Sequence, residues 1–199
     1  MQLTEDKKTV YYSLLDVSVP RPAYFGGADL YRMELASRRE EAVAKSRPDF
    51  NIATYALGRS FLLLPAADGK YGMNTDVDFY TLDYETLAVS PCAVYGESIG
   101  SSVGSDIRHG GGRTMKMDGD VLYFISTRFD SAGLYKLENG VVSPVTERGG
   151  SVDCFDRCGG KMLLCALWDM RAQELYDETG ARITHFNDAA LRGKYVARA

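Results

Sequence analysis

The chain has 199 residues, a formal net charge of −4 and 45% hydrophobic residues, enough to bury a substantial core in one or two domains. Its 23 lysines and arginines are scattered and form no basic stripe, so the sequence predicts no nucleic-acid partner. The N-terminal segment Met1–Lys8 is charged where a signal peptide requires an apolar core, and no apolar run reaches membrane-spanning length. We therefore expect a soluble, cytoplasmic protein without membrane contact.

A short phrase, consisting of an apolar residue, a tyrosine and an acidic end, recurs along the chain. It stands at Leu30–Glu34, Phe79–Asp83, Leu134–Glu138 and Leu175–Glu178. An apolar run rich in Leu, Val, Tyr and Phe precedes each copy, and Gly, Asp, Asn and Ser bound these runs, which is typical of strands joined by turns. A strand-pair unit that recurs roughly every 40 to 55 residues is the spacing of β-propeller blades. The sequence predicts an all-β fold, a partial β-propeller of about three to four blades of four-stranded antiparallel sheets.

The predicted blade units follow one another along the chain. Residues 8–48 give an incomplete unit, and residues 49–94 give the next. Residues 113–146 are the best defined, with hairpin turns expected at Asp118-Gly119 and Asn139-Gly140, where Asn and Gly tolerate positive φ. Residues 149–186 repeat this pattern, with a fourth strand expected at 181–184. We expect residues 1–199 to form one partial propeller domain, with residues 187–199 as a linker.

Two segments fit the strand pattern less well. Met33–Lys45 is charged and Ala-rich, so a short helix is an alternative there, although its apolar spacing is poor for an amphipathic helix. Residues 95–112 are rich in Gly and Ser, which favours a long connection between blades.

Motifs in a fixed order run through the second half of the chain. They are Ser102–Gly112, Met117–Phe124, Val152–Asp156 and the tail Thr184-His185-Phe186-Asn187. In this order they resemble the propeller of the prolyl oligopeptidase superfamily, above all its acylaminoacyl-peptidase and dipeptidyl-aminopeptidase-like branch. One departure is Leu57-Gly58-Arg59-Ser60, where such families usually have a Ser-Pro-Asp-Gly-Lys-like turn, and this leaves the register of the second unit open.

In that superfamily the propeller caps a C-terminal α/β-hydrolase domain, which carries the catalytic Ser, Asp and His. The resemblance implies that this chain is the non-catalytic, substrate-gating portion of a serine peptidase acting on short or N-blocked peptides. It also implies a hydrolase domain as the partner, with residues 187–199 leading toward it, a peptide substrate in the parent enzyme, and no cofactor. The alternative is an independent propeller-like module that binds a protein or a small ligand at its loops.

One segment matches the text of a hydrolase motif. Gly96-Glu97-Ser98-Ile99-Gly100 fits Gly-x-Ser-x-Gly, and Asp153, Asp156 and His185 follow in the chain order of an α/β-hydrolase triad. A nucleophile elbow needs a buried strand before the serine and a helix directly after it, whereas a poor helix former follows Ser98. We therefore predict a flexible connection at Ser98 and no catalytic residue in this chain.

Charged side chains cluster among the glycines of the connection between the second and third units. They are Asp106, Arg108, His109 and Arg113. Such side chains can reach a peptide or phosphate from a loop, and the resemblance implies that propeller loops face the cleft against the hydrolase. These residues are our candidates for a substrate-facing loop, although the simpler interpretation is a surface loop with compensating charges.

The remaining polar and aromatic residues favour structural roles. Neither histidine has a Glu or His at metal-binding spacing, so the sequence predicts no metal site. We expect reduced thiols, with Cys154 and Cys165 as small core residues. Trp168 and the recurring tyrosines suit the packing between blades. Because a few blades of a larger ring leave two blade faces uncovered, we also expect a homo-oligomer formed through these faces.

Overall fold

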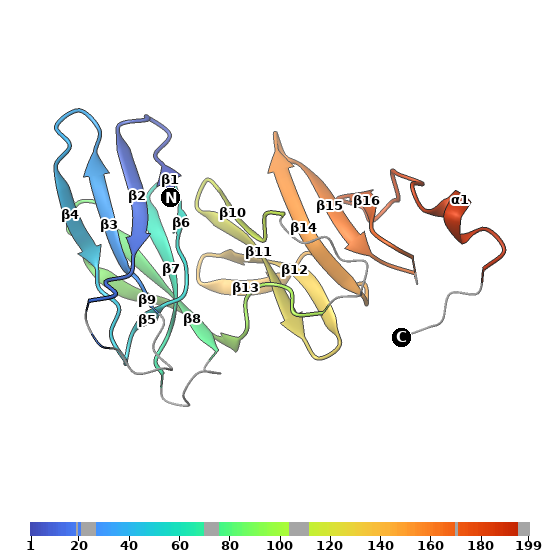
Figure 1. The fold of residues 1–199 in the computed structure, drawn as a ribbon, viewed down its shortest axis with the longest axis horizontal. Coiled ribbons are helices and arrows are strands. Elements are labelled where there is room, and N and C mark those ends of the chain that lie inside the picture. The colour runs from blue at the N-terminus through green and yellow to red at the C-terminus, as the bar shows by residue number, and fades with distance from the viewer. Residues whose placement is uncertain (19, 21–26, 70–75, 104–111, 170, 195–199) are drawn as a thin grey trace. The chain divides into compact units, whose positions relative to one another are not determined.

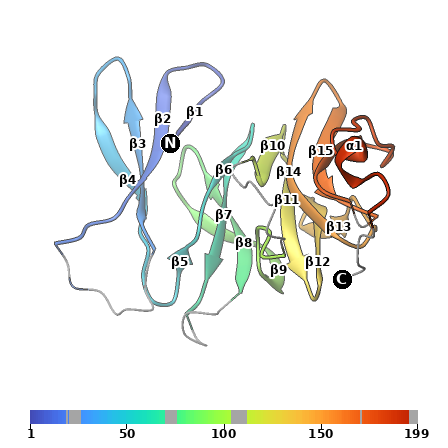
Figure 2. The same cartoon turned by 45° about the vertical axis from the view of Figure 1, so that its right-hand side comes forward.

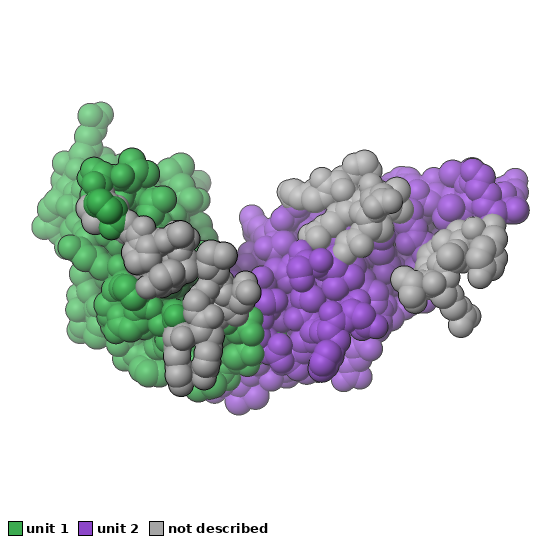
Figure 3. Space-filling view, turned by 60° about the horizontal axis from the view of Figure 1, so that its bottom comes forward, with its two compact units in different colours: residues 1–96 green, residues 97–199 purple. Residues whose placement is uncertain are grey.

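The computed structural model describes residues 1–18, 20, 27–69, 76–103, 112–169 and 171–194. Antiparallel strands dominate this part of the chain, and its helix α1 (Asp188–Leu191) has only 4 residues (Figure 1). The chain divides into two compact units, Met1–Gly96 and Glu97–Ala199, which Figure 3 colours separately. No helix in the described part of the chain is long and apolar enough to cross a membrane.

The first sheet of unit 1 is a meander of four consecutive strands (Figure 2). The strands are β1 (Gln2–Leu3), β2 (Thr9–Leu14), β3 (Asp29–Glu34) and β4 (Glu40–Ala44). The sequence predicted this unit only in part and left a helix open at Met33–Lys45, but β3, a turn and β4 occupy that stretch instead. Val43 and Ala44 are buried while Glu40 is exposed, so the apolar end of β4 covers the core and its charged end meets solvent.

The second sheet of unit 1 has the order β5-β7-β8-β9, with β6 also paired to β7. Its strands are β5 (Asn51–Ile52), β6 (Ala56–Leu57), β7 (Phe61–Ala67), β8 (Val77–Asp83) and β9 (Val89–Glu97). The register left open by the sequence is now defined, because Ala56 pairs with Leu63 and Leu57 with Leu62. The segment Leu57–Ser60, which departs from the family pattern, therefore forms the tight turn between β6 and β7. The Gly58 amide closes this turn by donating to the Phe61 carbonyl at 2.9 Å.

The two sheets of unit 1 share one apolar core. Tyr11 and Leu30 come from the first sheet, and Leu62, Leu64 and Leu82 come from the second. All of them are buried, so the sheets pack face to face through the inward half of each alternating strand. Tyr55 adds a polar link between the sheets, because its hydroxyl donates to the Tyr11 carbonyl at 2.8 Å.

Unit 2 contains two meanders in sequence. The first consists of β10 (Met115–Asp118), β11 (Val121–Arg128), β12 (Ser131–Glu138) and β13 (Val141–Pro144). The second consists of β14 (Ser151–Cys158), β15 (Lys161–Leu167) and β16 (Glu174–Asp177). A single parallel pair, Ala132 with Ser151, joins the meanders. The fourth strand expected at 181–184 is reduced to one bridge between Tyr176 and Arg182. The chain instead turns so that residues 184–187 donate hydrogen bonds to Glu174.

The core of unit 2 lies between these meanders. Ile125 and Leu134 come from the first meander, and Phe155, Leu164 and Trp168 come from the second. The hairpin at Asn139-Gly140 forms as predicted, with φ of 50° and 76° at these two residues. Each unit therefore consists of consecutive antiparallel meanders that bury their apolar faces against each other, which is the blade packing of a propeller.

Candidate functional site

Most of the predicted substrate-facing loop lies outside the described residues. Asp106, Arg108 and His109 belong to segment 104–111, and only Arg113 is described. Its carbonyl oxygen accepts a hydrogen bond from the Phe155 amide at 3.0 Å, which ties the entry of β10 to β14. Its guanidinium is exposed and lies 3.7 Å from the Asp156 carboxylate.

Arg113 belongs to a charged cluster between β10 and β14. Lys116 Nζ lies 2.7 Å from Asp156 Oδ1 and also donates to the Arg157 carbonyl. Arg157 Nε lies 2.5 Å from Asp118 Oδ2. The hydrogen bond from Lys116, followed by that from the Arg157 amide, lowers the pKa of Asp156. Each cation here faces a carboxylate, so the cluster fastens the two meanders of unit 2 together and does not present an open anion site.

A buried polar cluster lies at the start of β14, next to residue 103. Ser151 and Asp153 are only 3% and 7% exposed. Ser151 Oγ is 2.9 Å from the Val103 carbonyl and 3.1 Å from Asp153 Oδ1, and Gln173 Nε2 donates to Asp153 Oδ2 at 2.9 Å. From the sequence, Asp153 was considered as a triad residue and as part of the motif Val152–Asp156, whereas Ser151 and Gln173 were not considered. Polar residues two positions apart at the start of a strand, here Ser151 and Asp153 in β14, are the signal that points to such a cluster.

Ser98 does not have the surroundings of a nucleophile. It is exposed, and its carbonyl oxygen accepts a hydrogen bond from Ser126 Oγ at 2.7 Å. Ile99 then bridges to Ser126, and no helix follows within residues 98–103. His185 is engaged elsewhere, with its Nδ1 2.9 Å from Asp188 Oδ2. Among the described residues, no hydrogen bond joins Ser98 to His185 or Asp153.

The tail Thr184–Asn187 is organised by one buried carboxylate. Glu174 on β16 is 1% exposed. Its Oε2 accepts hydrogen bonds from Thr184 Oγ1 at 2.5 Å and the Phe186 amide at 3.1 Å, and its Oε1 accepts from the Asn187 amide at 2.9 Å and side chain at 3.0 Å. Burial raises the pKa of Glu174, but these hydrogen bonds outweigh it and leave the pKa below its ordinary value. The side chains of Thr184 and Asn187 and the backbone amides of Phe186 and Asn187 therefore supply the donors that one buried glutamate requires.

A second, exposed network follows the tail. Arg182 Nη1 and Nη2 donate to the two oxygens of Asp188 at 2.8 and 3.0 Å, and Arg171 Nη1 lies 3.0 Å from Asp188 Oδ1. The hydrogen bond from Arg182, with a second one from His185, holds the pKa of Asp188 far below its usual range. His185 is thus a member of an ion-pair network around α1.

The aromatic predictions are confirmed in part. Trp168 is 2% exposed, and its ring centroid lies 4.5 Å from that of Tyr176, so both pack in the core of unit 2. The other recurring tyrosines, Tyr31, Tyr80 and Tyr135, are half-buried and contact one neighbouring aromatic ring each.

The cysteine prediction is wrong in one respect. Cys154 and Cys165 are free thiols, but they are half-buried and lie on the face of β14 and β15 opposite the core. The alternation of β15 is the reason, because Leu164 and Ala166 take the inward positions. No group of three His, Cys, Asp or Glu side chains gathers within the described part of the chain in a way that could hold a metal ion.

Comparison with known proteins finds solved structures that share this fold. Neither a protein-family model nor a curated protein matches the sequence. Among solved structures, the β-propeller domain of the Trilobed protease from Pyrococcus furiosus matches with a TM-score of 0.64 and 18% identity over 92% of this chain and 53% of its own. Pyrococcus horikoshii acylaminoacyl peptidase matches with a TM-score of 0.67 and 19% identity over 94% of this chain and 27% of its own. TolB from Acinetobacter baumannii matches with a TM-score of 0.56 and 18% identity over 90% and 41%.

These matches establish the fold. The predicted all-β, partial-propeller architecture is confirmed, and so is the resemblance to the propeller portion of acylaminoacyl-peptidase-like enzymes. The chain covers 27% to 53% of the length of the Pyrococcus proteins that it matches.

Proposed function

We propose that this chain is the non-catalytic, substrate-gating propeller portion of a serine peptidase that acts on short or N-blocked peptides. The observation that carries the proposal is the match of 94% of the chain to acylaminoacyl peptidase, of which it spans 27%. The propeller domain of a second protease, the Trilobed protease, matches over 92% of the chain. Two peptidases thus contain the fold of this chain.

The internal geometry agrees with a supporting role. Ser126 donates to the Ser98 carbonyl, His185 contacts Asp188, and the charged cluster on β10 and β14 is internally compensated. In this proposal the catalytic Ser, Asp and His come from an α/β-hydrolase partner domain. In the same proposal the propeller restricts the access of large substrates, and its substrate-facing loop comprises Asp106, Arg108 and His109, which lie outside the described residues, and Arg113, whose guanidinium is exposed beside Asp156.

The reading frame downstream of Ala199 provides the first test. We expect it to continue into a segment with a helix-flanked Gly-x-Ser-x-Gly, and a stop codon directly after Ala199 would contradict the proposal. The second test uses the full-length protein encoded by this reading frame and measures its rate of cleavage of an N-acetyl tripeptide anilide and of casein. Gating predicts cleavage of the peptide and not of casein, whereas equal cleavage of both would reject the gating role.

A second function is an independent module that binds a protein or a small ligand. The match to TolB, over 90% of this chain, favours this possibility, because the fold is not confined to the peptidases above. A stop codon after Ala199, together with a stable complex between the purified chain and a partner protein, would support this function over the first.

A further inference from the structure

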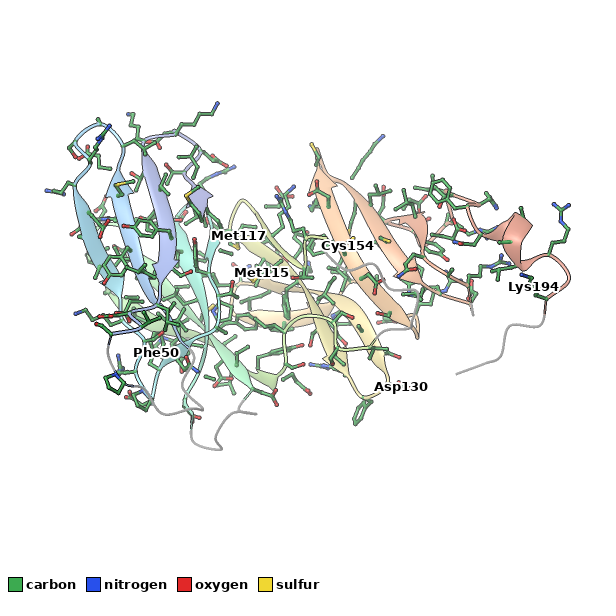
Figure 4. All side chains as sticks on the ribbon, in the orientation of Figure 1. Phe50, Met115, Met117, Asp130, Cys154 and Lys194 are labelled. Carbon is green, nitrogen blue, oxygen red and sulfur yellow. The ribbon has the colours of Figure 1, made fainter. Side chains whose placement is uncertain are left out.

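Two cysteines occupy directly opposite positions on a β-hairpin of unit 2. Cys154 on β14 and Cys165 on β15 are Cα partners in the antiparallel ladder (Cys154 is labelled in Figure 4). Residues opposite each other in such a ladder project from the same face of the sheet. Because Leu164 and Phe155 pair next to them and point into the core, the two thiols share the other face.

The spacing of an antiparallel ladder suits a disulfide at this position. Opposite Cα atoms lie about 4.5 or 5.5 Å apart, depending on the type of pair. A disulfide requires about 4.4 to 6.8 Å between the Cα atoms, so both types fall within its range. The register shifts between Val152 and Cys154, and such an irregularity gives the strand room to adjust the two Cβ atoms.

The third cysteine of this unit is placed differently. Cys158 pairs with Lys161 at the tip of the hairpin and is exposed. It is four residues from Cys154 along one strand, about 13 Å at the rise of an extended chain, which is too far for a disulfide. The fold therefore selects one pair among these three thiols.

The surroundings keep this pair accessible but slow to react. Both thiols are half-buried. Burial, followed by the charges of Cys154 and Asp153, raises the pKa of Cys165 to about 11. Burial likewise raises the pKa of Cys154. Glu174 on the neighbouring strand β16 also disfavours the Cys165 thiolate.

We propose that Cys154 and Cys165 form a reversible disulfide modification site when the chain meets a low-molecular-weight disulfide such as oxidised glutathione. The thiolate of one cysteine attacks the small disulfide, forming a mixed disulfide and releasing one small thiolate. The second cysteine, deprotonated, attacks the protein sulfur of the mixed disulfide and releases the other small thiolate. Overall the protein loses two protons and two electrons, and the small disulfide becomes two thiols. This inference does not depend on the proposed function.

Trypsin cleavage places the three cysteines of unit 2 on three different peptides, so the disulfide that forms can be identified. Cleavage after Arg148, Arg157, Lys161 and Arg171 places Cys154 in 149–157, Cys158 in 158–161 and Cys165 in 162–171. The native chain is incubated at low concentration in a glutathione redox buffer, blocked with iodoacetamide, digested without reduction and analysed by mass spectrometry. We expect peptide 149–157 linked to peptide 162–171 as the main cross-link, formed faster at pH 9 than at pH 7 because more thiolate is present.

Matched variants and an unfolded control complete the test. Cys158→Ser should leave the cross-link in place, and Cys165→Ser should abolish it and leave Cys154 reduced or glutathionylated. In urea the unfolded chain should favour cross-links to Cys158, which is closest to both in sequence. If the native chain gives the same mixture as the unfolded chain, or only mixed disulfides, the proposed site is wrong.

Discussion

Glu174 offers the sharpest test of how the C-terminal tail is held. Replacing it by glutamine keeps the size of the side chain but turns one of its two oxygens into an NH2 group. Each oxygen accepts two hydrogen bonds, from Thr184 and Phe186 or from the backbone and side chain of Asn187. Whichever oxygen is replaced, one backbone amide then faces another donor, that of Phe186 or that of Asn187, and the side chain of Thr184 or Asn187 must turn to accept instead of donate.

The expected cost follows from these contacts. A hydrogen bond to a charged acceptor contributes about 1.5 to 3 kcal/mol, and the partners of Glu174 are partly exposed, so water replaces some of what is lost. We expect Glu174→Gln to lower the free energy of unfolding by about 2 to 4 kcal/mol, and Glu174→Ala by at least as much. Glu178→Gln is the matched control. Because Glu178 is exposed, this substitution should change the free energy of unfolding by no more than about 0.5 kcal/mol.

The pH dependence provides an independent check. The pKa of Glu174 in the folded chain lies below its ordinary value of 4.5. Its contribution to stability is therefore present above the ordinary pKa and is lost as the pH falls through the folded pKa. Between pH 7 and pH 3 the wild type should lose more stability than Glu174→Gln, since the glutamine has no proton to take up.

Urea unfolding, followed by tyrosine and tryptophan fluorescence at both pH values, measures these differences. Amide hydrogen exchange at Phe186 and Asn187 locates them, because one of these two N–H groups loses its acceptor, depending on which oxygen of Glu174 the NH2 group replaces. Equal midpoints for wild type and Glu174→Gln at pH 7, or an identical loss of stability at low pH, would refute the reasoning.

Further predictions concern turns, association and reactivity. Gly150→Ala should destabilise unit 2 strongly, because Gly150 has a φ of +113° and a Cβ there would lie 2.4 Å from a carbonyl oxygen, whereas Gly119→Ala, at +63° in open space, should cost about 1 kcal/mol in urea unfolding. Leu163→Glu, on the outer face of β15, should weaken the proposed homo-oligomer in sedimentation velocity, and Val141→Glu on β13 should not. A fluorophosphonate probe should label neither the wild type nor Ser98→Ala.

The outcomes that contradict these predictions are equally definite. Equal stability of the two glycine variants would show that the close contact at Gly150 relaxes freely. A wild type that is monomeric at high concentration would reject association through uncovered sheet faces. Labelling of the wild type that disappears in Ser98→Ala would identify Ser98 as a nucleophile after all.

The strands that could be predicted from the sequence are those with a strong local signal. β11, β12 and β15 combine apolar runs with turn residues at both ends, and their existence follows from that pattern alone. β1 has only two residues and β4 begins with two glutamates, so neither carries such a signal. These strands form because β2 and β3 offer them unpaired backbone groups, which is a tertiary effect.

The polar sites were harder to predict than the fold, and Glu174 shows why. Glu174 and Tyr176 alternate as the buried positions of β16, so a carboxylate occupies a place where the pattern demands an inward side chain. A buried carboxylate needs several donors, but the sequence alone does not show which segment supplies them. Thr184, Phe186 and Asn187 do so only because the chain turns back after Tyr176 instead of adding a full fourth strand. The buried carboxylate and the return of the Thr184–Asn187 tail therefore depend on each other, and the Glu174→Gln experiment tests this dependence.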